Sequence, residues 1–275
     1  MKMKKRMMLI LCVLVSLLIS GCDKQVDKRD LAQKTLDNLN NLESYSSKMN
    51  MNLTMNSGEI DTVKVTLLSE QKTRRQEAKT QVDVKLGFSL MGLKKETNAT
   101  LISEVAQDGL IVYANDGREW KVISGGALGD VEQFDPMGSL TEYLSKLDGL
   151  EQVGREKIDG VTAARFDGTM DMEALKSIIA YSMLKEATGL DLEKVSLPDD
   201  TVEVKEGIPI SLWIDVDKAL PVKYSIDFSK ALDSVFAQME NGGETVKTDA
   251  TAEILITGYD NVEKIEIPQE AKDAL

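Results

Sequence analysis

Residues 49–56 read Met-Asn-Met-Asn-Leu-Thr-Met-Asn, a strict alternation of apolar and polar side chains. Successive side chains of a β-strand point to opposite faces of the sheet, so this period of two predicts a strand with one apolar and one polar face. Ser57 and Gly58 follow as a turn signal. A strand of this kind needs neighbours that share its two-faced pattern.

The same alternation returns further along the chain. It is found at residues 63–67, 82–90 and 97–105, and polar or glycine-bearing stretches separate these runs. Strands joined in sequence by short turns are typical of an antiparallel meander.

Three hairpins follow. The first two have Asp116-Gly117 and Asp159-Gly160 at their turns, where an Asp-Gly pair supplies the positive φ that a tight hairpin requires. The third joins residues 208–215 to 222–228. Residues 250–258 then predict a strand, and residues 262–268 an extended edge strand that ends at a proline. Residues 229–248 fit either a strand extension or a short helix.

Three helices are expected among the strands. Asp30 is the expected cap of the first helix, whose apolar positions recur at intervals of three and four residues. The second covers residues 140–150, and Asp171 caps the third, which carries a broad apolar face. Their apolar positions are Leu31, Thr35, Leu36, Leu39 and Leu42, then Leu140, Tyr143, Leu144, Leu147 and Leu150, then Met172, Leu175, Ile178, Ile179, Met183 and Leu184.

Residues 1–21 form a signal peptide, with a basic start and an apolar run at 9–19 that is short for a membrane span. Leu18-Ile19-Ser20-Gly21-Cys22 looks like a lipobox, which predicts cleavage before Cys22 and a diacylglyceryl group on its thiol. An ordinary secretory signal is the weaker alternative, because the only other cysteine, Cys12, lies inside the signal. Two fatty chains give stable attachment to the outer face of the cell membrane. Residues 22–29 are then the lipidated cysteine and tether, and residues 30–275 a single domain.

The composition excludes several classes of function. The chain has a net charge of -13 and no histidine. Loss of Lys2, Lys4, Lys5 and Arg6 with the signal makes the mature part -17, which argues against a nucleic-acid partner. Without histidine there is no serine–histidine triad and no histidine-ligated zinc. We expect no enzyme, no cofactor and no metal, although catalysis by carboxylates alone is a distant alternative.

An aspartate cluster near the third hairpin deserves comparison with calcium sites. Asp215, Asp217 and Asp227 lack the glycine and glutamate spacing of an EF-hand, so we interpret them as turn residues.

Residues 210–215, Ile-Ser-Leu-Trp-Ile-Asp, with Lys218, Leu220-Pro221-Val222-Lys223-Tyr224 and the closing run 262–268, resemble the LolA/LppX-like lipoprotein superfamily, closest to an uncharacterised Gram-positive branch. The resemblance spans about Asp30 to Leu275. It implies an α+β fold, an open, curved antiparallel half-barrel whose concave face is covered by helices. It further implies a hydrophobic cavity between sheet and helices.

The ligand-cavity candidates are apolar and aromatic side chains of the third helix and of two strands. For the helix, a lid over a lipid pocket and ordinary packing on the sheet are equally good interpretations. For the tryptophan, which faces away from Leu212 and Ile214, a place in the core is slightly favoured over the cavity. The candidates are Ile178, Ile179, Tyr181, Met183, Leu184, Phe88 and Trp213.

The numerous methionines suit adaptable apolar surfaces, but core packing is favoured over ligand lining. They are Met49, Met51, Met55, Met91, Met137, Met170, Met172, Met183 and Met239.

These patterns favour a non-enzymatic carrier or binder of a lipid or acyl chain, anchored through Cys22 outside the cell membrane. The alternative is an interaction or envelope-sensor lipoprotein with a filled half-barrel and a protein partner. Fold alone does not choose between them.

Overall fold

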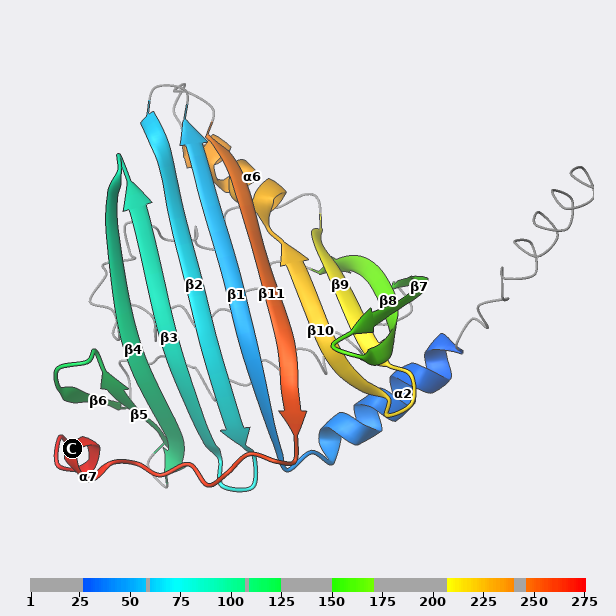
Figure 1. Ribbon diagram of the computed structural model, residues 1–275, viewed down its shortest axis with the longest axis horizontal. Coiled ribbons are helices and arrows are strands. Elements are labelled where there is room, and N and C mark those ends of the chain that lie inside the picture. Colours follow the sequence, from blue (N-terminus) through cyan, green and yellow to red (C-terminus); the bar gives the residue numbers. More distant parts are fainter. Residues whose placement is uncertain (1–26, 58–59, 107–108, 125–149, 171–206, 240–245) are drawn as a thin grey trace, which may run out of the picture.

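One large open antiparallel sheet dominates the protein (Figure 1). The computed structural model describes residues 27–57, 60–106, 109–124, 150–170, 207–239 and 246–275. Within them eleven strands pair in the order β6-β5-β4-β3-β2-β1-β11-β10-β9-β8-β7. The predicted antiparallel meander is confirmed.

The first half of the sheet is a simple meander. Its strands are β1 (Ser44–Ser57), β2 (Ile60–Arg74), β3 (Lys79–Leu90), β4 (Leu93–Ala106), β5 (Gly109–Asn115) and β6 (Trp120–Ser124). Gly117 has a φ of +88° in the turn between β5 and β6, which confirms the first predicted hairpin.

The second half adds β7 (Glu151–Ile158), β8 (Val161–Met170), β9 (Ile208–Asp215), β10 (Leu220–Asp227) and β11 (Lys247–Tyr259). The other two predicted hairpins, β7–β8 and β9–β10, are both present. β11 pairs with β1 and so joins the two halves at the centre. β6 and β7 follow each other along the chain yet form opposite edges, which is why the sheet is open.

The two faces of the sheet differ sharply. One face, here called the apolar face, carries the even-numbered residues of β9 and the odd-numbered residues of β1 from Tyr45 to Met55. Two clusters of buried side chains lie on it, one over β8–β11 and one over β2–β6, and Met49 and Met51 pack against both. The opposite, polar face carries most of the charged side chains of the central strands.

Two helices contribute to the apolar face. Leu31 and Leu39 of α2 (Lys28–Asn40) and Ala231 of α6 (Ser229–Met239) belong to the cluster over β8–β11. α6 resolves the ambiguity of residues 229–248 in favour of a helix. The expected helix at 140–150, apart from its last residue Leu150, and the expected helix from 171 lie outside the described residues. Helical cover of the rest of this face therefore stays a prediction.

The first helix begins earlier than its sequence pattern suggests. Asp27, not Asp30, is its cap, because the Asp27 carboxylate accepts hydrogen bonds from the backbone N–H groups of Arg29 and Asp30 at 3.0 and 3.3 Å. Both aspartates precede apolar positions, and sequence spacing alone does not choose between them. The helix thus takes up Lys28 and Arg29, which were assigned to the tether.

The predicted edge strand at residues 262–268 is wrong. This stretch is not part of the sheet. It crosses to the polar face, where Ile265 and Ile267 pack with Ile102 and Tyr113. Ala271, in the short helix α7 (Gln269–Lys272) that follows, joins the same cluster. Alternating side chains show that a segment is extended with one buried side, but not that it pairs with a strand.

No helix in the described part of the chain is both long and apolar enough to span a bilayer.

Candidate ligand-binding face

The apolar face is richest in adaptable side chains along β1. Met51 lies opposite Leu67 of β2 and Ala252 of β11, and Leu53 lies opposite Ala250. The two alanines are small, buried neighbours of the long side chains of β1. Met49, Met51, Leu53 and Met55 are only partly buried. Met49, Met51 and Leu53 pack against a cluster that includes fully buried side chains. Flexible thioethers beside small residues form a surface that can adapt to an apolar partner.

One end of this face carries buried polar groups. Gln71 Nε2 donates to the Tyr45 hydroxyl at 3.2 Å and to Thr73 Oγ1 at 3.0 Å, and Thr73 Oγ1 lies 3.2 Å from Thr80 Oγ1. These hydrogen bonds satisfy groups that would be costly to bury alone. They continue the row of apolar positions on β2 and β3, and alternation by itself gave no sign that they are buried.

Phe88 lies towards the other end of the same face, opposite Val65 of β2 and Lys95 of β4. It is 40% exposed. Its place on the apolar face agrees with its choice as a cavity candidate, but its role in ligand binding is untested.

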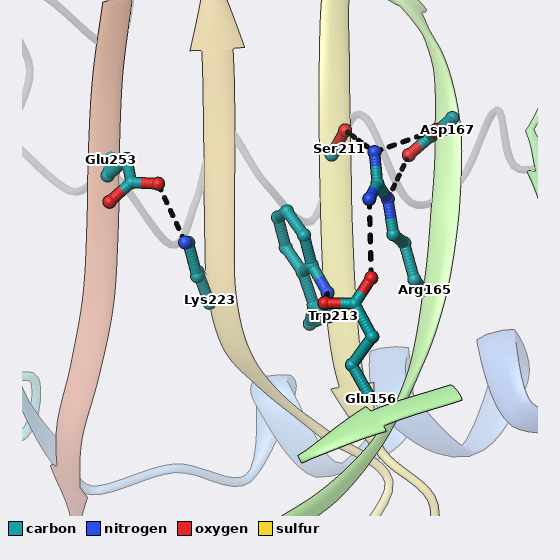
Figure 2. A network of polar contacts seen from close by, with 7 residues as sticks. All are labelled: Glu156, Arg165, Asp167, Ser211, Trp213, Lys223 and Glu253. Carbon is teal, nitrogen blue, oxygen red and sulfur yellow. Dashed lines mark hydrogen bonds and ion pairs between the residues drawn. The ribbon is translucent and has the colours of Figure 1, made fainter. Parts of the chain in front are cut away.

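Trp213 lies on the polar face (Figure 2). Its neighbours across the sheet are Arg165 of β8 and Lys223 of β10, and their cationic groups are 5.1 and 4.9 Å from the ring centroid. Its indole N–H donates to Glu156 Oε2 at 3.0 Å. Only 6% of the residue is exposed. A tryptophan between two cations with a bound N–H is held in one orientation.

An ionic network surrounds this tryptophan. Arg165 Nε donates to Asp167 Oδ1 at 2.8 Å, and Arg165 Nη1 donates to Glu156 at 3.2 Å. Burial raises the pKa of Asp167, but hydrogen bonds from Arg165 and Ser211 and the charge of Arg165 outweigh it, so the pKa lies below its ordinary value. Lys223 Nζ donates to Glu253 at 2.7 Å.

Trp213 is buried, as the favoured core position predicts, but its surroundings are not those of the apolar core. Its face, opposite Leu212 and Ile214, was predicted correctly, but it joins neither the apolar cluster over β8–β11 nor Phe88. The cationic groups of Arg165 and Lys223 lie over its ring instead. The other candidates, Ile178, Ile179, Tyr181, Met183 and Leu184, lie outside the described residues, as does Cys22.

Core packing is confirmed for Met170 and wrong for Met91, whereas for the partly buried Met49 and Met51 it stays a prediction. Met49 and Met51 pack against the apolar clusters and Met170 is buried, but Met91 is 65% exposed in the turn between β3 and β4.

The polar face has a shallow depression of about 710 Å³. Side chains that contribute to it include Lys48, Glu70, Asp83, Lys85 and Glu253. Leu68 and Leu255 also line it, and it lies on the opposite face from the cavity expected between sheet and helices.

The aspartates near the third hairpin serve local structure. Asp215 Oδ1 accepts from the N–H groups of Asp217 and Lys218 at 2.8 and 3.1 Å, and Asp227 Oδ1 accepts from Ser229 N at 3.0 Å. The prediction of turn residues is confirmed for Asp215, which bonds the turn, and for Asp217, which lies in it. It is wrong for Asp227, which ends β10 and whose carboxylate accepts from the first residue of α6. The described residues hold no cluster of three or more potential metal ligands.

The protein is thus an open antiparallel sheet protein in which helices α2 and α6 pack against the apolar face. The family model of the LppX_LprAFG lipoproteins matches residues 27–192, more than half of the chain, and the chain belongs to this family. The resemblance to the LolA/LppX-like superfamily is thereby confirmed. The matched range ends before the tryptophan hairpin on which that resemblance rests in the sequence.

Solved structures show similar chains at low identity. LprF from Mycobacterium bovis is 15% identical with a TM-score of 0.47, over 88% of this chain and 97% of LprF. LppX from Mycobacterium tuberculosis is 14% identical with a TM-score of 0.40, over 88% of this chain and all of LppX. No curated protein matches this chain.

Proposed function

We propose that this protein is a non-enzymatic, extracytoplasmic lipoprotein that binds a lipid or acyl chain against the apolar face of its sheet. The observation that carries the proposal is the continuous apolar face, on which Met49 and Met51 connect two clusters. Membership in a lipoprotein family supports it. At about 25 cal/mol per Å² of apolar surface, part of one acyl chain supplies several kcal/mol without polar recognition.

Anchoring through lipid on Cys22 is part of the same proposal. α2 begins at Lys28, so only a few residues separate the proposed lipid from the body. Mass spectrometry of the N-terminal peptide from membranes should show a diacylglyceryl group on Cys22. A Cys22→Ser variant should lose that group, and an unmodified Cys22 in membrane-bound protein would refute the anchor.

Ligand binding is tested with a matched pair of variants. Leu86→Gln changes a partly buried side chain that packs on the apolar face, whereas Leu68→Gln makes the same change on the polar face, where Leu68 is 45% exposed. We expect Leu86→Gln to weaken binding of a fluorescent fatty acid by about tenfold, because a buried leucine contributes ~1.5–3 kcal/mol when fully covered. Leu68→Gln should bind like the wild type.

One observation favours the alternative of a filled half-barrel that acts through a protein partner. Leu67 is 3% exposed and Val112 is fully buried, which shows that parts of the apolar face are already covered. Extraction of lipid from the purified protein, followed by mass spectrometry of the extract, distinguishes the two functions. Co-purifying lipid supports the carrier, whereas its reproducible absence together with no uptake of fatty acid would leave the partner-binding function.

A further inference from the structure

The turn between β3 and β4 exposes an unusual group of apolar side chains. Met91 is 65% exposed, Leu93 is 76% exposed and Phe88 is 40% exposed. They lie within six residues of one another at one hairpin end, here called the β3–β4 tip (residues 85–96). In Figure 1 this tip lies at the end of the sheet away from α2. Scattered exposed apolar residues are ordinary, but a group of them at a protruding turn indicates a contact surface.

The backbone shows that an apolar residue is held at this tip against its conformational preference. Met91 and Gly92 have φ angles of +50° and +77°, and Leu90 pairs with Leu93 on either side of them. Asn or Asp is the usual residue at the first of two such positions. The β7–β8 turn of this same chain follows that rule, with Asp159 and Gly160 at +48° and +86°. Met91 departs from that rule, as do Ala78 and Ala219, but of these three only Met91 places a large apolar side chain at its turn.

Positive charge surrounds the apolar tip. Residues 85–96 contain three lysines and one glutamate, a net charge of +2 in a chain of net charge -13. Lys85 pairs with Glu96 at 2.9 Å, and this leaves Lys94 and Lys95 without an ion-pair partner in the described part of the chain. Lys95 lies directly opposite Phe88. Exposed apolar side chains next to lysines match the chemistry of an anionic lipid surface.

We infer that the β3–β4 tip docks on an anionic lipid bilayer. Met91, Leu93 and Phe88 enter the region between headgroups and acyl chains, while Lys94 and Lys95 reach the anionic headgroups with their flexible stems. The acidic remainder of the chain is repelled by the same headgroups, but this repulsion is screened beyond about 10 Å at 0.1 M salt. The contact is thus confined to the tip.

Sedimentation with lipid vesicles tests this inference. The chain from residue 22 onward, with Cys22→Ser so that no lipid is attached, keeps every described element. We expect it to bind phosphatidylglycerol vesicles more strongly than phosphatidylcholine vesicles, and more weakly as salt rises. Met91→Asp with Leu93→Asp should lower the partition coefficient at least about tenfold, because it removes the apolar contact and adds repulsion. Lys94→Gln with Lys95→Gln should lower it roughly tenfold on phosphatidylglycerol only.

Val153→Asp is the matched control, because Val153 is 50% exposed on the edge strand β7, which is not part of the tip. It should bind vesicles like the unsubstituted chain. Folding is checked by far-UV circular dichroism, and aspartate is compatible with the positive φ at residue 91.

Three results would overturn the inference: no binding to phosphatidylglycerol, equal loss of binding in Val153→Asp and the tip variant, or a tip variant that turns a dimer into a monomer while vesicle binding is unchanged. The last would assign the tip to self-association. None of these results bears on fatty-acid binding at Leu86, so failure here is distinguishable from failure of the proposed function.

Discussion

Replacement of Trp213 by alanine should lower the unfolding free energy of the protein but leave its affinity for a fatty acid unchanged. Trp213 is 6% exposed and lies beneath Arg165 and Lys223 on the polar face. Truncation of a buried aromatic residue costs about 3–5 kcal/mol in a well-packed core. The covering side chains here are long and partly exposed, so they can close part of the space and admit water. We therefore expect Trp213→Ala to lose about 2–3 kcal/mol of unfolding free energy.

Trp213→Phe is the conservative partner of this change. It keeps a ring between the two cations but loses the N–H bond to Glu156, whose side chain is 43% exposed and can turn to solvent. The expected loss is about 1 kcal/mol. Urea unfolding followed by far-UV circular dichroism measures both variants without relying on tryptophan emission.

Fatty-acid binding provides the second measurement on the same variants. Because Trp213 faces away from the apolar clusters, the folded Trp213→Ala protein should bind a fluorescent fatty acid as the wild type does. A tenfold weaker affinity of the folded variant would refute this assignment. Trp213 would then belong to the ligand site.

Three further changes test other parts of the structure. Met91→Asn should raise the unfolding free energy by about 1 kcal/mol, since asparagine tolerates the left-handed conformation, and an unchanged urea midpoint would count against that conformation. The pKa of Asp167 is lowered, so its ionised form stabilises the fold at pH values above its ordinary pKa of 3.8, and this contribution disappears as pH falls through the folded value. Asp167→Asn should therefore be less stable than wild type at neutral pH but not in strong acid, whereas parallel stability curves would contradict this. Ile265→Ala should cost about 2–4 kcal/mol in urea unfolding, because Ile265 is 3% exposed against Ile102 and Tyr113, and a neutral result would show that the C-terminal segment is not fixed there.

The pattern of residues along the chain determines the strands and their faces. The alternation at 49–56 predicted β1, and the Asp-Gly pairs at 116–117 and 159–160 predicted two hairpins, all of which are present. Side-chain direction in a strand depends only on the parity of position, so these features are local and can be predicted without a partner.

Tertiary structure alone decided what each face contacts. Alternation assigned Trp213 to the face opposite Leu212, but its cover comes from Arg165 and Lys223 on neighbouring strands, whose register no local pattern specifies. The buried Gln71 and Thr73 look like solvent-facing residues until Tyr45 and Thr80 are brought beside them. Residues 262–268 have the pattern of a strand, but they pack on the polar face without joining the sheet. Burial depends on residues distant in sequence, and only the folded chain brings them together.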